Sequence, residues 1–284
     1  MKRPSHFLAA LLGLCLMAPS AFPADAPSGE PGLFQRFEKA LGIGVTNRVR
    51  LFDGAPLDHF YTWIDKQGTF VDPKGVFTVK DGLLRISGEQ VGYLATKSEY
   101  SDYRLIVEYK WGDKIYLFRD KPKNSGVMVH GIGLDKVWMK SIECQVSPGS
   151  TGDVVVQSGA SITAGGTNLF RPWATFPRVV DREVEFPAGK WNVMEILCEG
   201  GRVQVKVNGH VTIDGRDVYP NHGKILFQSN GAEIFFRRMD LIPLFPVHEP
   251  TTPPKSGAEP AKDKPQDTAP KPETKPDTAA PPTK

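Results

Sequence analysis

The chain has 284 residues, of which 24% are charged and 40% are hydrophobic, and its formal net charge is +3. So small a charge, with no run of Lys and Arg interleaved with aromatic residues, argues against a nucleic-acid partner. The length suits one large domain with appendages or two small domains.

The first residues predict a secretory signal peptide over residues 1–26. Lys2 and Arg3 provide a positive start, and the apolar stretch 7–17 is too short to span a bilayer as a helix. The small residues at 24–26 suit cleavage. We therefore expect an exported protein, periplasmic or extracellular, with no transmembrane segment in its mature chain. An uncleaved membrane anchor is the alternative.

Two segments flank the central part of the chain. Apolar residues at helical spacing in the N-terminal extension, 27–47, predict a short amphipathic helix, unless this segment is a strap packed on the domain edge. The last segment, 246–284, is rich in Pro, Lys, Thr, Ala and Asp and almost lacks large apolar residues, so it cannot offset the entropy of ordering. We expect a disordered tail there, which either contacts the cell envelope or is simply solvated.

The central part, 48–245, consists of short runs rich in Val, Ile, Phe and Tyr between Gly, Asp and Asn turns. Asn208-Gly209, between two such runs, is the strongest hairpin signal. Many short strands without intervening helices predict an all-β sandwich or jelly roll rather than a parallel α/β sheet. The expected strands include Val76–Val79, Leu83–Ser87, Tyr103–Trp111, Gly126–His130, Ser141–Val146, Asp153–Gln157, Asn192–Cys198, Arg202–Val207, Lys224–Ser229 and Glu233–Ile242.

The cysteines give no sign of a zinc site. After the signal peptide only Cys144 and Cys198 remain, with no CxxC pair and no Cys/His cluster. An oxidising compartment permits a bridge between them. Both lie in predicted strands, however, where buried free cysteine is a common core residue, so we expect two free thiols.

The segment richest in polar side chains comprises two predicted strands joined by residues 131–139. A simple hairpin places Met128 opposite Glu143. Because side chains alternate across a strand, His130, Glu143 and Gln145 then point to one face. Diagonal neighbours across such a pair lie about 7–8 Å apart. We expect His130 and Glu143 to converge on one ligand or one metal ion, unless this is a solvated face on which they stand by chance.

Further candidate residues surround this pair. Asn124 and Gln145 carry amides that suit sugar hydroxyls. Trp138 and Trp173 are stacking platforms for pyranose rings, or else ordinary edge packing. Asp153 either reaches the same groove or forms a turn.

Several motifs stand in a characteristic order along the β region: Leu51-Phe52-Asp53-Gly54, Gly92-Tyr93-Leu94-Ala95-Thr96, Asn124-Ser125-Gly126-Val127, Ser141-Ile142-Glu143-Cys144-Gln145, Thr151-Gly152-Asp153, Gly223-Lys224-Ile225 and Phe236-Arg237-Arg238. In these motifs the chain resembles the 3-keto-disaccharide hydrolase domain family. The resemblance implies a concanavalin A-like jelly roll and cleavage of glycosides whose C3 hydroxyl has been oxidised to a ketone. It also implies, from some members, elimination chemistry and a divalent metal. Many members carry Arg at the position of His130.

The residues suit elimination better than ordinary hydrolysis. A ketone at C3 acidifies the hydrogen on C2, so that one base can remove it while the C1 substituent departs. Hydrolytic glycosidases need two carboxylates, which laminarinase-like jelly rolls hold in a Glu-x-Asp-x-x-Glu pattern that the run from Glu143 lacks.

Two roles stay open for each candidate catalytic residue. Glu143 is expected as base or metal ligand, and His130 as acid/base or metal ligand. A divalent cation, whether Mg, Mn, Ca or Zn, would polarise the ketone. The alternative function is a non-catalytic carbohydrate-binding module, since jelly rolls serve in both ways.

Overall fold

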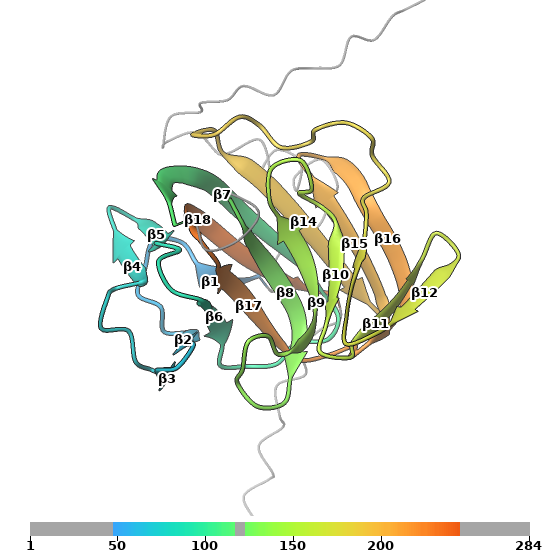
Figure 1. Ribbon diagram of the computed structural model, residues 1–284, viewed down its shortest axis with the longest axis horizontal. Coiled ribbons are helices and arrows are strands. Elements are labelled where there is room, and N and C mark those ends of the chain that lie inside the picture. Colours follow the sequence, from blue (N-terminus) through green and yellow to red (C-terminus); the bar gives the residue numbers. More distant parts are fainter. Residues whose placement is uncertain (1–47, 117–122, 245–284) are drawn as a thin grey trace, which may run out of the picture. The chain divides into compact units, whose positions relative to one another are not determined.

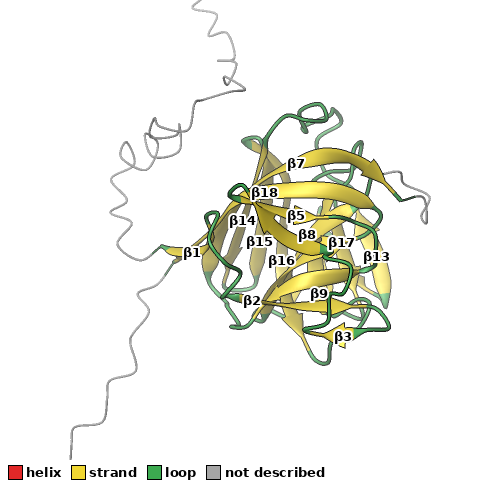
Figure 2. Ribbon diagram, turned by 90° about the vertical axis from the view of Figure 1, so that its left-hand side faces the viewer, coloured by secondary structure: helices red, strands yellow, loops and turns green. Residues whose placement is uncertain are grey.

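The computed structural model describes residues 48–116 and 123–244. The predicted signal peptide, N-terminal extension and C-terminal tail lie outside the described residues. Within these residues the chain forms only strands, turns and loops (Figure 2), so they contain no helix long and apolar enough to cross a membrane.

One of the two sheets has ten strands. They are β1 (Val49–Phe52), β4 (Phe77–Lys80), β5 (Leu83–Ile86), β7 (Tyr103–Ile115), β11 (Ser161–Ala164), β12 (Thr167–Phe170), β14 (Asn192–Glu199), β15 (Arg202–Val207), β16 (His210–Tyr219) and β18 (Ala232–Pro243). Their spatial order is β12-β11-β16-β15-β14-β7-β18-β5-β4, with β1 paired to β18.

The facing sheet has eight strands. They are β2 (Phe60–Ile64), β3 (Gly68–Thr69), β6 (Gly92–Thr96), β8 (Ser125–Ile132), β9 (Lys140–Val146), β10 (Val154–Gln157), β13 (Trp173–Phe176) and β17 (Lys224–Ser229). Their order is β13-β10-β9-β8-β17-β6-β2-β3. The two sheets are antiparallel and form the layers of a jelly-roll sandwich (Figure 1), which confirms the predicted all-β fold.

The core lies between the two sheets and follows the period-2 pattern of the strands. In β14, Met194, Ile196 and Cys198 are buried in the core, while the residues between them are partly exposed. Cys144 of β9 enters the same core from the other sheet. Both cysteines are buried and free, as predicted.

The Asn208-Gly209 hairpin forms as predicted and joins β15 to β16. Val207 pairs with His210, and the φ angles of Asn208 and Gly209 are 48° and 83°. A type I′ turn needs positive φ at both positions, and Asn followed by Gly adopts this with little strain.

A β-bulge interrupts the pairing of β8 with β9. Met128 lies opposite Glu143, as the hairpin prediction requires, but the register shifts between Val129 and Ile132. His130 stands inside this shift with φ of 58°. A bulge inserts an extra residue and so reverses the face to which the following side chains point.

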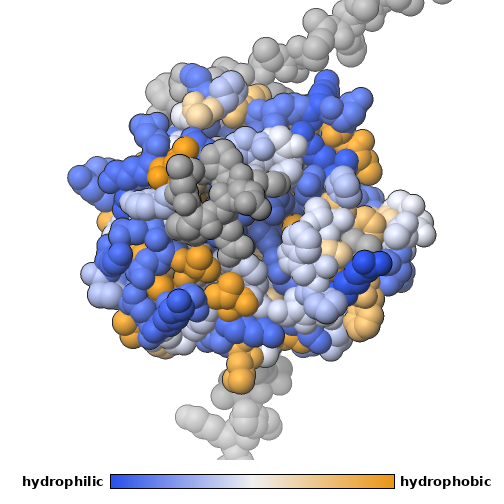
Figure 3. All heavy atoms as spheres, in the orientation of Figure 1, coloured by the Kyte–Doolittle hydropathy of each residue, from blue (hydrophilic) through white to orange (hydrophobic). Residues whose placement is uncertain are grey.

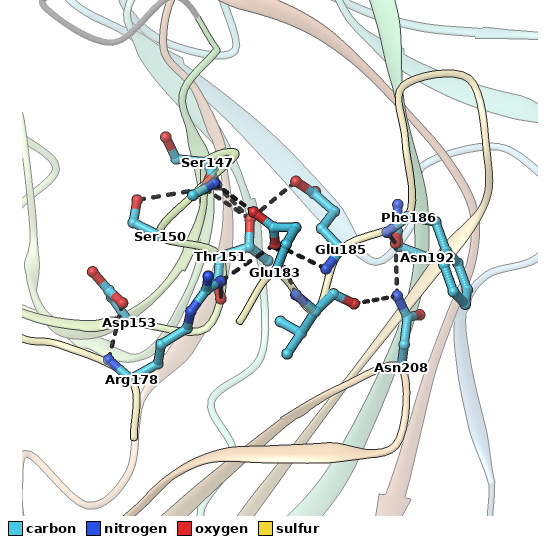
Figure 4. A network of polar contacts seen from close by, with 12 residues as sticks. Ser147, Ser150, Thr151, Asp153, Arg178, Glu183, Glu185, Phe186, Asn192 and Asn208 are labelled. Atoms are coloured by element: carbon cyan, nitrogen blue, oxygen red, sulfur yellow. Dashed lines mark hydrogen bonds and ion pairs between the residues drawn. The ribbon is translucent and has the colours of Figure 1, made fainter. Parts of the chain in front are cut away.

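A buried carboxyl group fixes the segment between β13 and β14. Glu185 Oε1 accepts hydrogen bonds from Tyr109 Oη (2.8 Å) and Trp111 Nε1 (2.9 Å). Its Oε2 accepts one from Thr151 Oγ1 at 3.2 Å (Figure 4). Burial raises the pKa of Glu185, and the three donors act in the opposite direction. The contacts attach this long segment to β7 and to the turn before β10.

Candidate functional site

The candidate site lies on the outer face of the eight-stranded sheet, the face turned away from the core. Val127 and Val129 of β8 point into the core, whereas Met128 belongs to a second apolar cluster. Met128 is therefore on the outer face. Glu143 is its direct cross-strand partner and shares that face.

The carboxylate of Glu143 is held by two amide side chains from neighbouring strands. Gln157 Nε2 in β10 donates to Oε2 through a short hydrogen bond, and Gln228 Nε2 in β17 donates to Oε1 at 3.0 Å. Glu143 is only 3% exposed. A buried carboxylate needs such donors, because it cannot keep its hydration shell.

Two predicted sugar-binding residues are joined to each other. Gln145 is the next residue of β9 on the outer face, and its Nε2 donates to Asn124 Oδ1 at 2.5 Å and to the Ser125 carbonyl at 3.3 Å. Ser125 Oγ in turn donates to the Gln228 carbonyl at 2.7 Å. Gln145 and Asn124 therefore adjoin the residues that hold Glu143, and Gln145 shares the face of Glu143 as the sequence predicts.

The predicted convergence of His130 and Glu143 is wrong. The bulge turns the imidazole toward the core, where its ring packs edge-on against Tyr103 of the facing sheet at 5.8 Å between centroids. Its Nδ1 lies 3.1 Å from the carbonyl oxygen of Pro220. Burial lowers the pKa of His130 to about 4, although nearby carbonyl groups act to raise it. His130 is thus a neutral, buried residue outside the Glu143 cluster.

The loop between β8 and β9 crosses one end of the outer face and carries Trp138. This indole packs partly buried against the second apolar cluster, and its carbonyl accepts a hydrogen bond from Ser158 Oγ at 2.7 Å. At the other end of the loop, Asp135 Oδ1 accepts from Tyr61 Oη and Tyr93 Oη, both at 2.8 Å. The loop is therefore fixed at two points.

Exposed apolar side chains gather beside this loop. Phe70 and Leu134 are among the most exposed large hydrophobic residues of the described chain. In Figure 3 hydrophobic residues cluster in the lower left of the view, where Figure 1 shows β2, β3 and β6. The outer face thus has an apolar part beside the polar residues around Glu143.

Trp173 and Asp153 lie on the far side of Glu143. Trp173 of β13 is the cross-strand partner of Gln157, so it shares the outer face, and it is 63% exposed. Asp153 Oδ1 accepts a hydrogen bond from the Arg178 backbone N–H at 3.0 Å (Figure 4). Trp173 is open to stack on a ligand, whereas Asp153 holds the chain at Arg178.

The described residues do not support the predicted metal site. Its two expected ligands, His130 and Glu143, are separated by the bulge. No group of three or more His, Cys, Asp or Glu residues with metal-binding geometry occurs in residues 48–116 and 123–244.

A family model described as the 3-keto-alpha-glucoside-1,2-lyase-like domain matches residues 47–242. The chain belongs to this family. The match covers nearly the whole described β region and confirms the resemblance seen in the sequence motifs. Membership of the 3-keto-alpha-glucoside-1,2-lyase-like family supports a carbohydrate-active role. No curated protein matches the chain.

Several solved structures are similar to this chain at low sequence identity. One candidate glycosyl hydrolase from Parabacteroides distasonis superposes with a TM-score of 0.51 and 18% identity, covering 74% of this chain and 97% of that one. A second candidate glycosyl hydrolase from the same organism has a TM-score of 0.47 and 21% identity, and the match covers 69% of this chain and 99% of that one. The Bacillus licheniformis β-glucanase has a TM-score of 0.44 and 10% identity, and the match covers 68% of this chain and 97% of that one. The first of these supports the jelly-roll fold.

The sequence did not reveal Gln157 and Gln228 as site residues. They stand 14 and 85 positions after Glu143 and reach it only because β10 and β17 lie in the same sheet as β9. The available local signal was a glutamine at an outward position of a predicted strand, which is also common on solvated faces.

Proposed function

We propose that this protein cleaves 3-keto-glycosides by elimination, with Glu143 as the base. The carboxylate takes the hydrogen from C2, which the C3 ketone acidifies. The electron pair of that C–H bond forms a double bond between C1 and C2. The C1–O bond breaks, and the leaving oxygen keeps its electron pair and receives a proton. The carboxylic acid formed at Glu143 is adjacent to that oxygen and is the proton source.

The composition of the Glu143 cluster is the observation that carries this proposal. Two residues that donate hydrogen bonds to the carboxylate, Gln157 and Gln228, do so through amide groups. On the same strand, the next outward position is Gln145, another amide. A retaining or inverting glycosidase needs a second carboxyl group at a defined separation, whereas an elimination needs only one base.

Amide side chains also suit the ligand. Each carries donors and an acceptor for sugar hydroxyls or for the oxygen of an enolate. Because Glu143 is 3% exposed, neighbouring atoms must move aside before a substrate can touch it.

The test uses a 4-nitrophenyl 3-keto-α-glucoside with deuterium at C2. Elimination predicts release of nitrophenol, loss of the deuterium, and a sugar product lighter by one water than the hydrolysis product. Glu143→Gln should lower the rate at least about 100-fold. Glu233→Gln is the matched control, because Glu233 is also buried but pairs with Arg85 on the other sheet. A hydrolysis product that keeps its deuterium would refute the mechanism.

A carbohydrate-binding module is the second candidate, and the exposure of Trp173 favours it. An exposed indole offers an apolar ring face against which a sugar can pack, and such packing needs no reactive group. In that case Trp173→Ala should weaken binding of an unoxidised glucoside about 10-fold, an effect of the size of one stacking contact. Glu143→Gln should then leave binding unchanged, and no 3-keto-glycoside should be cleaved.

We also propose that the protein works outside the cytoplasm, in the periplasm or beyond. The basis is the N-terminal sequence alone. Mass spectrometry of the mature chain from its native host tests this, since export predicts a new N-terminus close to residue 26. An intact Met1 terminus in a cytoplasmic fraction would refute it.

A further inference from the structure

A directed chain of amides leads away from Glu143 along the outer face. Gln228 Nε2 donates to the carboxylate, and Asn230 Nδ2 donates to Gln228 Oε1 at 3.3 Å. Asn230 stands in the turn that follows β17 and is 3% exposed. The polar part of the site therefore continues beyond the end of β17.

The carboxylate fixes the orientation of both amides. An ionised carboxylate only accepts hydrogen bonds, so Gln228 must present its nitrogen to Glu143 and its oxygen to the other side. Asn230 must then present its nitrogen to that oxygen. The atom left at the end of this chain is Asn230 Oδ1, a hydrogen-bond acceptor.

That acceptor is buried and has no hydrogen-bond partner among the described residues. Native proteins rarely leave a buried polar atom unpaired, and each exception calls for a cause. A second such acceptor, Gln90 Oε1, belongs to an adjoining turn, which Ser229 Oγ contacts by donating to the Gln90 carbonyl at 2.6 Å. Two unpaired amide oxygens in adjoining turns are suited to the hydroxyl groups of a sugar.

We propose that Asn230 Oδ1 accepts a hydrogen bond from a ring hydroxyl of the bound glycoside. The inference rests on the proposed function, because it assigns part of the ligand to the site at Glu143. Its alternative is that Asn230 only positions Gln228. The two roles differ in one respect, since only a direct contact makes the affinity depend on a particular hydroxyl of the ligand.

The experiment measures binding, so that it does not depend on turnover. Methyl α-glucoside and its mono-deoxy analogues are titrated by calorimetry into the full protein and into Asn230→Ala. Wild type should lose about 10-fold in affinity with one analogue, the effect of one hydrogen bond. Asn230→Ala should lose the same factor with the parent sugar and show no additional loss with that analogue.

The control variant is Asn168→Ala, which removes an exposed amide that donates to Thr163 Oγ1. It should bind all sugars as wild type does. If Asn230→Ala does not fold, Asn230→Asp keeps an oxygen at this position and should retain the preference for the hydroxyl.

Two results would overturn the inference. One is an Asn230→Ala protein that still discriminates against the same analogue, because the hydroxyl would then have another partner. The other is a wild type that binds every analogue equally. If wild type shows the expected preference but cleaves no 3-keto-glycoside, the subsite stands and the proposed function fails.

Discussion

The side chain of Glu143 lies across Gly126. A Cβ atom built on Gly126 would lie 2.5 Å from Glu143 Oε1 and 2.9 Å from its Cγ. Gly126 faces outward on β8 between Gln145 of β9 and the amide of Gln228. The missing side chain thus provides the space in which the carboxylate meets its donor from β17.

Gly126→Ala should therefore move the base without unfolding the protein. The clash involves the end of a flexible side chain, which can turn away, so we expect a loss of stability of about 1–2 kcal/mol. The displaced carboxylate loses its place beside Gln228, and the rate of 3-keto-glycoside cleavage should fall at least about 10-fold, because catalysis is sensitive to small displacements. Denaturant unfolding and steady-state kinetics measure the two effects.

Gly112→Ala is the matched control for this prediction. A Cβ atom on Gly112 would meet the side chain of Glu233, in the same way but in the ten-stranded sheet. Its cost in stability should be similar, and its cleavage rate should equal that of wild type. Equal losses of activity in both variants would show that the effect comes from general destabilisation.

His130 predicts a pH dependence of stability. Its pKa in the folded protein is lowered from 6.5 to about 4, chiefly by burial. The unfolded chain therefore binds the proton first, and protonation favours unfolding. Stability should fall by about 3 kcal/mol as the pH drops from about 6.5 to about 4, and the loss is complete only below the folded pKa.

His130→Asn isolates this effect, because asparagine tolerates positive φ and does not titrate. The variant will be less stable at neutral pH, having lost the ring contact with Tyr103. Between pH 6.5 and 4 the unfolding free energy of this variant should depend less steeply on pH than that of wild type. The difference in slope should correspond to nearly one proton taken up on unfolding. Identical slopes would show that His130 titrates normally.

The sequence predicts the strands and tight turns well because both depend on local chemistry. Alternating apolar residues mark β14, and Asn208-Gly209 marks the turn between β15 and β16. The site depends on features that local chemistry does not fix. A single bulge at His130 reverses the face of its side chain, and nothing in the alternation of β8 announces it. Gln228 reaches Glu143 only through strand order, which is set by the packing of the whole sheet.

Glu185 should be essential for stability rather than for chemistry. Glu185→Leu leaves the buried donors of Tyr109 and Trp111 unpaired, and it should cost about 2–4 kcal/mol. Glu185→Gln keeps one acceptor oxygen and should cost less. Unfolding in guanidinium measures both. Equal losses for the two variants would mean that the volume of the side chain matters and its oxygens do not.

Asp135 should control ligand affinity through the loop that carries Trp138. Asp135→Ala removes the acceptor shared by the Tyr61 and Tyr93 hydroxyls, so that end of the loop is no longer fixed. Trp138 keeps its contact with Ser158, and Glu143 keeps both amides. We expect KM for a 3-keto-glycoside to rise about 10-fold while kcat changes less than about twofold, since ground-state and transition-state binding weaken together. Asp135→Asn retains one acceptor and should lie between wild type and Asp135→Ala. A lower kcat at unchanged KM would place Asp135 in the chemical step instead.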